Sequence, residues 1–145
     1  MQWQIEIPIT PQAKQSFRYT ARNNKVIRYQ PRDKLNYVGA IKTYAMAKRP
    51  DRLLEGALEL SVDFIFPFLG KHSKKVRQEV TEGKILYKTT KPDVDNLLKP
   101  LKDALRGVVY ADDNQVAAYG RIRKIYGESG KLIIIIKEFP VEKIT

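Results

Sequence analysis

The segment 57–68, ALELSVDFIFPF, limits the possible folds of this chain more than any other stretch. Apolar residues alternate with others along most of it, and β-branched and aromatic residues are frequent, which predicts a strand. Alternate side chains of a strand point to opposite faces of a sheet. One face of this strand would therefore carry five apolar side chains: Leu58, Leu60, Val62, Phe64 and Phe66. Such a strand requires a sheet around it and a layer covering its apolar face.

The rest of the sequence predicts both the other strands of this sheet and the helices that would cover it. Alternation predicts further strands at 3–9, 116–127 and 131–139, and the last two would be joined as a hairpin by GESG at 127–130. Apolar residues at helical spacing predict an amphipathic helix at 33–48 and a second one at about 95–106.

Two short alternating runs on either side of Asn23-Asn24 predict a separate hairpin. The resulting order is strand, hairpin, helix, strand, helix, strand, strand. We therefore predict an α+β fold: a single domain over residues 1–145, with one mixed sheet and two main helices packed on it.

Net charge separates the possible functions. Among 145 residues, 27 are Lys or Arg and 16 are Asp or Glu, which gives a formal net charge of +11. A basic domain of this kind favours a polyanionic partner such as nucleic acid. The absence of cysteine excludes a disulfide scaffold, a thiolate zinc site and a cysteine nucleophile. The first residues lack the features of a signal peptide, and LIIIIK is too short to cross a bilayer, so we expect a cytoplasmic protein with no membrane association.

Residues 70–91 form a polar, basic segment that interrupts the core pattern. It contains a possible short helix near 73–81, and we interpret the whole segment as a basic insertion. His72 within it is interpreted as a loop residue or a DNA contact rather than a metal ligand. Phosphate contacts position DNA without reading its sequence. The cations expected to make them are Lys71, Lys74, Lys75, Arg77, Lys84, Lys88 and Lys91.

Four aspartates stand at segment boundaries: Asp93 and Asp95 where the basic segment enters a helix, and Asp112 and Asp113 in the next turn. Gathered carboxylates repel one another and need a cation, and Mg²⁺ prefers such oxygen ligands. A structural alternative exists for each pair. An aspartate at a helix start is a favoured N-cap, and Asp-Asp-Asn is typical of turns.

Lys99 follows Asp95 by one helical turn. It is suited either to stabilising charge on a phosphate or to an ordinary ion pair along the helix. Pro100 lacks the N–H that a helix interior needs, so we expect the helix to start late, near Asn96, or to bend at this point.

The segment 91–116 resembles the RusA family of Holliday junction resolvases, which are common in phages and prophages. The family pattern is a basic residue, D-x-D-N-L-x-K, a helix with D-A-L and a D-D-x-Q turn. This chain has KPDVDNLLKPLKDALRGVVYADDNQV. Pro100 and the long basic segment 70–91 are departures from the compact pattern.

The resemblance implies an endodeoxyribonuclease that resolves four-way DNA junctions by paired symmetric nicks in recombination and repair. It implies dependence on Mg²⁺, with Mn²⁺ as a possible substitute, and no small-molecule cofactor. A homodimer would match the two-fold symmetry of the junction. By residue, Asp93, Asp95 and Asp113 match the catalytic metal ligands, Asp112 the adjacent acid, and Lys99 the catalytic lysine. Two alternatives remain: a non-catalytic protein that binds branched DNA, and a metal nuclease that acts on other branched nucleic acids.

Overall fold

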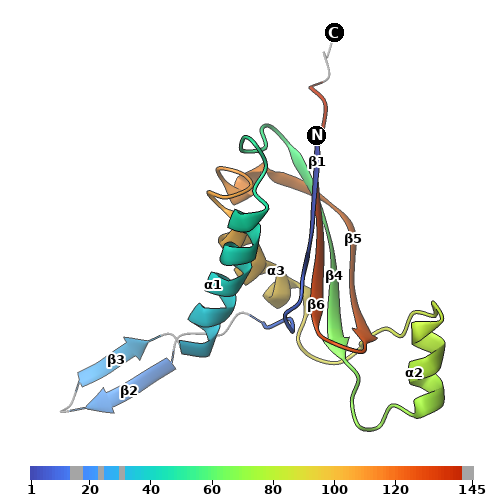
Figure 1. Cartoon of the computed structure of the whole chain (residues 1–145). Helices are drawn as coiled ribbons and strands as arrows, with labels where there is room; N and C mark the ends of the chain where they lie inside the picture. The colour runs from blue at the N-terminus through green and yellow to red at the C-terminus, as the bar shows by residue number, and fades with distance from the viewer. Residues whose placement is uncertain (14–17, 23–24, 30–31, 142–145) are drawn as a thin grey trace.

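The computed structural model describes residues 1–13, 18–22, 25–29 and 32–141. Its centre is a four-stranded mixed sheet of order β1-β6-β4-β5 (Figure 1). Strand β6 is antiparallel to both β1 and β4, whereas β4 is parallel to β5. Two helices, α1 and α3, lie on one side of this sheet (Figure 1). The predicted α+β fold, with a mixed sheet and two main helices, is confirmed.

The four predicted sheet strands all form. Their bounds are β1 (Gln2–Ile7), β4 (Leu58–Pro67), β5 (Val116–Gly127) and β6 (Lys131–Glu138). Strict alternation of exposed and buried residues along β1 buries Trp3, Ile5 and Ile7 against the helices. On β4 the expected face is buried from Leu58 to Phe64, and Phe66 packs partly buried at its end.

The prediction that residues 127–130 form a hairpin is wrong. Strands β5 and β6 do not pair, because β4 lies between them. Their short connection instead crosses the end of β4, where Phe68 N donates to Gly127 O at 3.0 Å. The cause is not local. Strand β4 has the longest buried apolar face of the sheet. In its central position both of its backbone edges are hydrogen-bonded to neighbouring strands, whereas at the edge of the sheet one of them would be unpaired.

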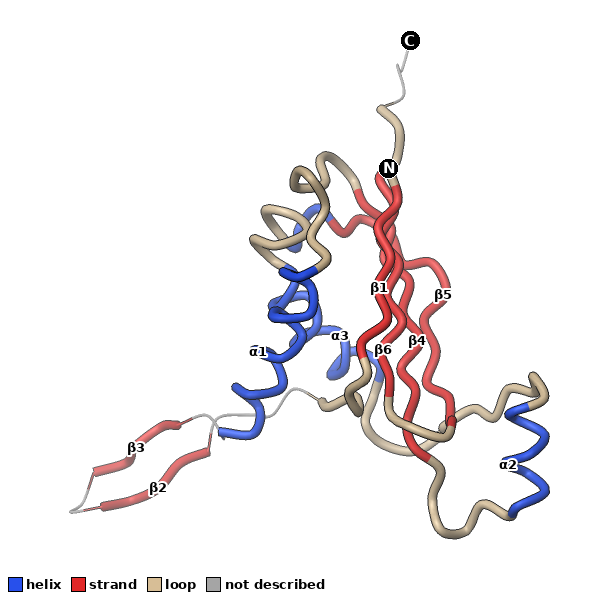
Figure 2. The backbone as a smooth tube through the Cα atoms, viewed as in Figure 1, coloured by secondary structure: helices blue, strands red, loops and turns tan. Residues whose placement is uncertain are grey.

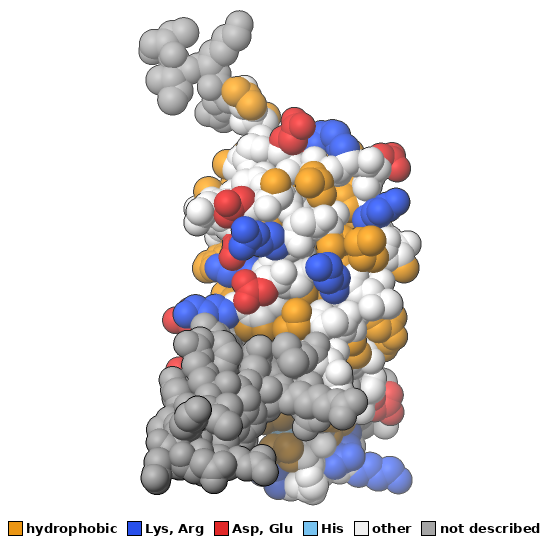
Figure 3. Space-filling view, turned by 90° about the vertical axis from the view of Figure 1, so that its left-hand side faces the viewer, with side chains coloured by type: hydrophobic (Ala, Val, Ile, Leu, Met, Phe, Trp, Pro, Cys, Tyr) orange, Lys and Arg blue, Asp and Glu red, His pale blue; other side chains and the backbone are white. Residues whose placement is uncertain are grey.

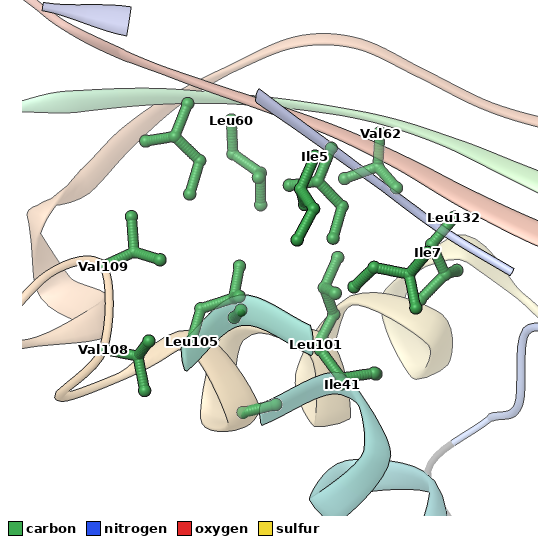
Figure 4. Packing of buried hydrophobic residues seen from close by; sticks show 14 of the residues in the cluster. Ile5, Ile7, Ile41, Leu60, Val62, Leu101, Leu105, Val108, Val109 and Leu132 are labelled. Carbon is green, nitrogen blue, oxygen red and sulfur yellow. The ribbon is translucent and has the colours of Figure 1, made fainter. Parts of the chain in front are cut away.

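Helices α1 (Arg32–Ala47) and α3 (Val94–Leu105) pack on each other and on the sheet. Ile41 of α1 and Leu101 of α3 belong to the same buried cluster as Ile5 and Leu60 from the strands (Figure 4). The Trp3 indole also donates to Lys48 O at 2.8 Å, which ties β1 to the end of α1. None of the helices within the described residues is both long and apolar enough to span a bilayer.

Helix α2 (Lys74–Thr81) forms where a short helix is predicted. Ser73 caps it by accepting a hydrogen bond from Val76 N at 3.2 Å. It buries none of its residues. Long loops connect it to the body, and it lies on the side of the sheet away from α1 and α3 (Figure 2).

The predicted N-terminal hairpin is confirmed in its strands. β2 (Arg18–Arg22) pairs antiparallel with β3 (Lys25–Tyr29). Asn23 and Asn24, on which the turn prediction rests, lie outside the described residues.

Helix α3 begins earlier than predicted, at Val94, and Pro100 lies inside it. The expectation of a late start near Asn96 is therefore wrong. Pro100 is buried together with Leu97, Leu98, Leu101, Ala104 and Leu105. Because burial of this face stabilises the helix, tertiary packing outweighs the cost of a proline in its interior.

Candidate active site

The loop that enters α3 is held by a lysine from the neighbouring strand. Lys124 Nζ of β5 donates to Thr90 O at 2.7 Å and to Pro92 O at 2.8 Å. Asp93 then occupies the N-cap position, where its main-chain carbonyl accepts from Leu97 N at 3.2 Å. Its side chain makes no capping hydrogen bond. The expectation that Asp93 stands at the helix start is met, and its carboxylate is exposed and available to a ligand.

One side of α3 is buried and the opposite side carries charge. The charged side runs along the helix at spacings of three and four residues, which brings successive side chains to one face. Its members are Asp95, Lys99, Lys102, Asp103 and, at the C-cap, Arg106. Asp95 and Lys99 share a surface hollow of about 350 Å³ with Asn96, Leu98, Lys102 and Tyr119. The helix thus places the predicted acid and the predicted lysine at one site.

Asp112 belongs to a capping box at the start of the 3₁₀ helix η1 (Asp113–Gln115). Its Oδ1 accepts from Asn114 N at 2.9 Å, and Gln115 Oε1 accepts from Asp112 N at 3.0 Å. Gln115 Nε2 in turn donates to Leu54 O at 3.1 Å and to Gly56 O at 3.2 Å. These bonds fasten the acidic turn to the loop before β4, so Asp112 has a structural role.

Asp113 lies near the other end of α3 from Asp95. Its Oδ1 is 3.9 Å from Arg106 Nε, at the helix C-cap. Tyr110 is close by, since its hydroxyl donates to Lys102 O at 2.9 Å. Burial raises the pKa of Tyr110 well above its usual range, and the charges of Asp113 and Asp103 raise it further. The acidic turn therefore packs against the C-terminal half of α3.

The predicted carboxylates are not assembled into one metal cluster. Within residues 1–13 and 36–141, where side chains are described, no three His, Asp or Glu side chains are grouped to hold a metal ion. Asp93 and Asp95 supply exposed carboxylate oxygens at one end of α3. These suit the kind of Mg²⁺ site in which one or two carboxylates bind and substrate phosphate and water complete the shell. Asp113 Oδ1 instead lies 3.9 Å from Arg106 Nε.

The predicted DNA-binding cations fall into two groups. Lys71, Lys74, Lys75 and Lys91 are exposed, and their side chains make no hydrogen bond or ion pair with the described part of the chain. The other three are engaged within the protein. Arg77 donates to His72 O and Leu69 O, Lys84 pairs with Glu79 at 3.4 Å, and Lys88 donates to Thr90 Oγ1 at 2.8 Å.

His72 joins this internal group. Its Nδ1 accepts from Leu69 N at 2.9 Å, and its ring centroid lies 4.5 Å from that of Tyr126. Desolvation, and then the charges of Lys71 and Arg77, lower its pKa. Lys88 Nζ lies over the rings of Phe66 and Tyr126. His72 therefore holds the loop before α2 against β5, a role that its isolated position in the sequence did not indicate.

The sequence patterns did not identify four further residues at this site: Lys102, Arg106, Tyr110 and Tyr119. The three-residue step from Lys99 to Lys102 was the one signal available for Lys102. The tyrosines come from a loop and from β5, and only the tertiary structure brings them to α3.

Comparison with known proteins agrees with the motif. The family model for endodeoxyribonuclease RusA matches residues 8–137. Uncharacterized protein YqaN of Bacillus subtilis (strain 168) is 32% identical over 123 residues, which cover 83% of this chain and 85% of that protein. Crossover junction endodeoxyribonuclease rusA of Lactococcus phage r1t is 25% identical over 137 residues, which cover 94% of this chain and 97% of the phage protein. The match begins after β1 and covers both main helices, β4, β5 and all but the last residue of β6, and the chain belongs to the RusA endodeoxyribonuclease family.

Proposed function

We propose that this chain resolves four-way DNA junctions by Mg²⁺-dependent hydrolysis of phosphodiester bonds, in DNA recombination and repair. One observation carries the proposal beyond family membership. Asp95 and Lys99, two residues of the family motif, line the same hollow at the exposed end of α3, and Asp93 caps the same helix. A carboxylate and a lysine so close together suit a site that binds both a cation and a phosphate.

The proposed roles follow from donor chemistry. Asp93 and Asp95 would hold Mg²⁺, or Mn²⁺ in its place, and Asp112 and Asp113 are the further candidate ligands. When bound, the metal would supply an activated water and charge stabilisation at the leaving oxygen. Lys99 would place its ammonium beside the scissile phosphate and stabilise negative charge there. Asp113 matches the third catalytic acid of the family motif, and its neighbour in the structure is Arg106 at the C-cap of α3.

DNA is proposed to approach along the basic segment 70–91, which we regard as an insertion in a single domain over residues 1–145. The four exposed lysines of that segment are the best candidates for phosphate contacts: Lys71, Lys74, Lys75 and Lys91. The surface shown in Figure 3 is a poorer candidate, since basic and acidic side chains are interspersed on it. Two copies related by a two-fold axis would supply the two symmetric nicks that a junction requires.

The test compares a mobile four-way junction with a linear duplex of the same sequence, each with Mg²⁺ or with EDTA. Wild type should nick only the junction, in symmetric pairs, and EDTA should abolish the reaction. Asp95→Asn and Asp93→Asn should abolish nicking and leave junction binding intact or tighter, because each removes a negative charge facing the phosphates. Asp51→Asn removes an exposed aspartate outside the motif and is the matched control.

Each alternative predicts a different outcome. Tight junction binding without nicks in any metal would identify a non-catalytic binder of branched DNA. Cutting of flaps or RNA in preference to the junction would identify a metal nuclease with another branched substrate. Loss of binding together with cutting in both aspartate variants would contradict the proposed roles.

A further inference from the structure

Lys102 stands one helical turn beyond Lys99 on the charged side of α3 and lines the same hollow as Asp95. Its Nζ is 2.8 Å from the Tyr119 hydroxyl and 5.4 Å from the centroid of the Tyr119 ring. Tyr119 comes from β5, 17 residues later in the chain. The lysine is therefore held by a partner from a different element, outside its own helix.

Lys102 makes a hydrogen bond to a tyrosine through its main chain and another through its side chain. Its main-chain carbonyl accepts the Tyr110 hydroxyl at 2.9 Å, and its ammonium meets Tyr119. A lysine normally loses considerable rotamer freedom when it binds a ligand. A lysine that is already held loses less, so the site is preorganised for binding.

The Lys102 ammonium retains the capacity to bind an anion. It has three N–H donors, and within the described chain Tyr119 is its one side-chain hydrogen-bond partner. Lys102 forms no ion pair with a carboxylate of the described residues, although Asp95 and Asp103 belong to the same side of the helix. The hollow itself carries Lys99 and Lys102 against Asp95 alone. The two ammonium groups therefore outnumber the carboxylate, which favours binding of the negatively charged DNA backbone.

We propose that Lys102 and Tyr119 form a second phosphate-binding subsite, for the DNA backbone phosphate adjacent to the scissile one. Lys102 binds the phosphate, and Tyr119 is a positioning residue that aims the ammonium into the hollow. This subsite rests on the proposed nuclease function and deepens it, because it fixes the register of the strand relative to Asp95. A purely structural role, in which the bond only fastens α3 to β5, is the competing explanation.

The first experiment measures junction binding in EDTA, without cleavage, across a range of salt concentrations. The slope of log K against log[salt] decreases in magnitude by about 0.9 for each phosphate contact that is lost. Lys102→Met should show this decrease, and Lys102→Arg should restore the wild-type slope. Lys137→Met removes an exposed lysine of β6 and should match wild type. A wild-type slope for Lys102→Met would overturn the proposal.

The second experiment locates the phosphate. Each phosphate around the cut site is replaced in turn by an uncharged methylphosphonate. For wild type, one replacement next to the cut site should weaken binding, and for Lys102→Met that replacement should have no further effect. Tyr119→Phe, which keeps the ring and removes the hydroxyl, should weaken binding about threefold to tenfold, the value of one hydrogen bond, and keep the wild-type salt slope.

The outcomes separate this subsite from the nuclease function. The subsite alone is overturned if wild type cuts junctions and Lys102→Met binds DNA and responds to methylphosphonates as wild type does. Wild type that binds no DNA overturns both. If Lys102→Met fails to fold, as judged by thermal unfolding, Lys102→Gln and Tyr119→Phe test the same predictions.

Discussion

Arg106 Nε lies 3.9 Å from Asp113 Oδ1, which joins the C-cap of α3 to the acidic turn. Both side chains reach solvent, with 60% and 32% of their surfaces exposed. A pair this exposed stabilises a fold by about 0–1 kcal/mol. In the proposed metal site, the guanidinium would compete with the cation for the Asp113 carboxylate.

Arg106→Gln should therefore lower the Mg²⁺ concentration at which junction cleavage is half-maximal, and change the free energy of unfolding by less than about 1 kcal/mol. Metal titration of cleavage and urea unfolding measure the two effects. Arg49→Gln, an exposed arginine next to α1, is the control. An unchanged metal requirement in Arg106→Gln would count against Asp113 as a metal ligand.

Leu54 should support the acidic turn through the core. It is 1% exposed, and its N donates to Val109 O at 2.7 Å. Leu54→Ala should cost about 2–5 kcal/mol of unfolding free energy, as is typical of buried leucines. Its neighbour Leu53 is 40% exposed, so Leu53→Ala should stay within about 0.5 kcal/mol. Equal losses in urea unfolding would show that this loop is not packed as described.

Asp63 anchors an ion pair on the sheet face that α1 and α3 leave uncovered. Arg123 donates to it twice, at 2.7 and 3.1 Å, and this hydrogen bonding raises the pKa of Arg123. Asp63→Asn should cost about 1.5–3 kcal/mol, the range for hydrogen bonds to charged groups. Arg121 serves as the control, because its guanidinium lies 3.5 Å from the same carboxylate but its side chain is 66% exposed. Arg121→Gln should therefore lower the free energy of unfolding only slightly. Chemical denaturation of both variants measures these free energies of unfolding. A negligible loss of stability in Asp63→Asn would show that the ion pair with Arg123 does not stabilise the sheet.

Glu138 should make the free energy of unfolding depend on pH in the acidic range. Hydrogen bonds from the Arg52 guanidinium and from Glu55 N lower its pKa from the usual 4.5 to about 2. A carboxylate with a lowered folded-state pKa stabilises the fold above its unfolded pKa, and this stabilisation is lost as the pH falls towards the folded value. The stability difference between wild type and Glu138→Gln should thus be full at pH 7 and shrink between about pH 4.5 and 2. Denaturation at several pH values measures it, and a constant difference would refute the linkage.

Lys75 and Lys88 should respond differently, although the sequence places both in the basic segment. Lys75 is exposed on α2, so Lys75→Met should reduce the salt slope of junction binding by about 0.9 and leave stability unchanged. Lys88 is half-buried and bonded to Thr90 Oγ1, so Lys88→Met should lower the melting temperature. Salt titrations and thermal melts of both proteins separate a DNA contact from a structural lysine. The distinction would be wrong if Lys88→Met melted as wild type does.

The sequence by itself determined the elements and the motif. Alternation over 57–68 and helical spacing over 33–48 are local patterns, and the structure forms β4 and α1 within a few residues of the predicted bounds. The motif around Asp95 and Lys99 is also local, since one helix carries both residues, and family membership followed from it.

Only the tertiary structure decided which distant parts meet. Strands β5 and β6 are consecutive in the chain yet lie on opposite sides of β4, because β4 has both edges paired. Asp113 lies beside Arg106, and Lys102 meets Tyr119, because the sheet places β5 and its preceding turn along α3. Such contacts depend on burial and pairing across the whole core, and residue spacing within one segment does not encode them.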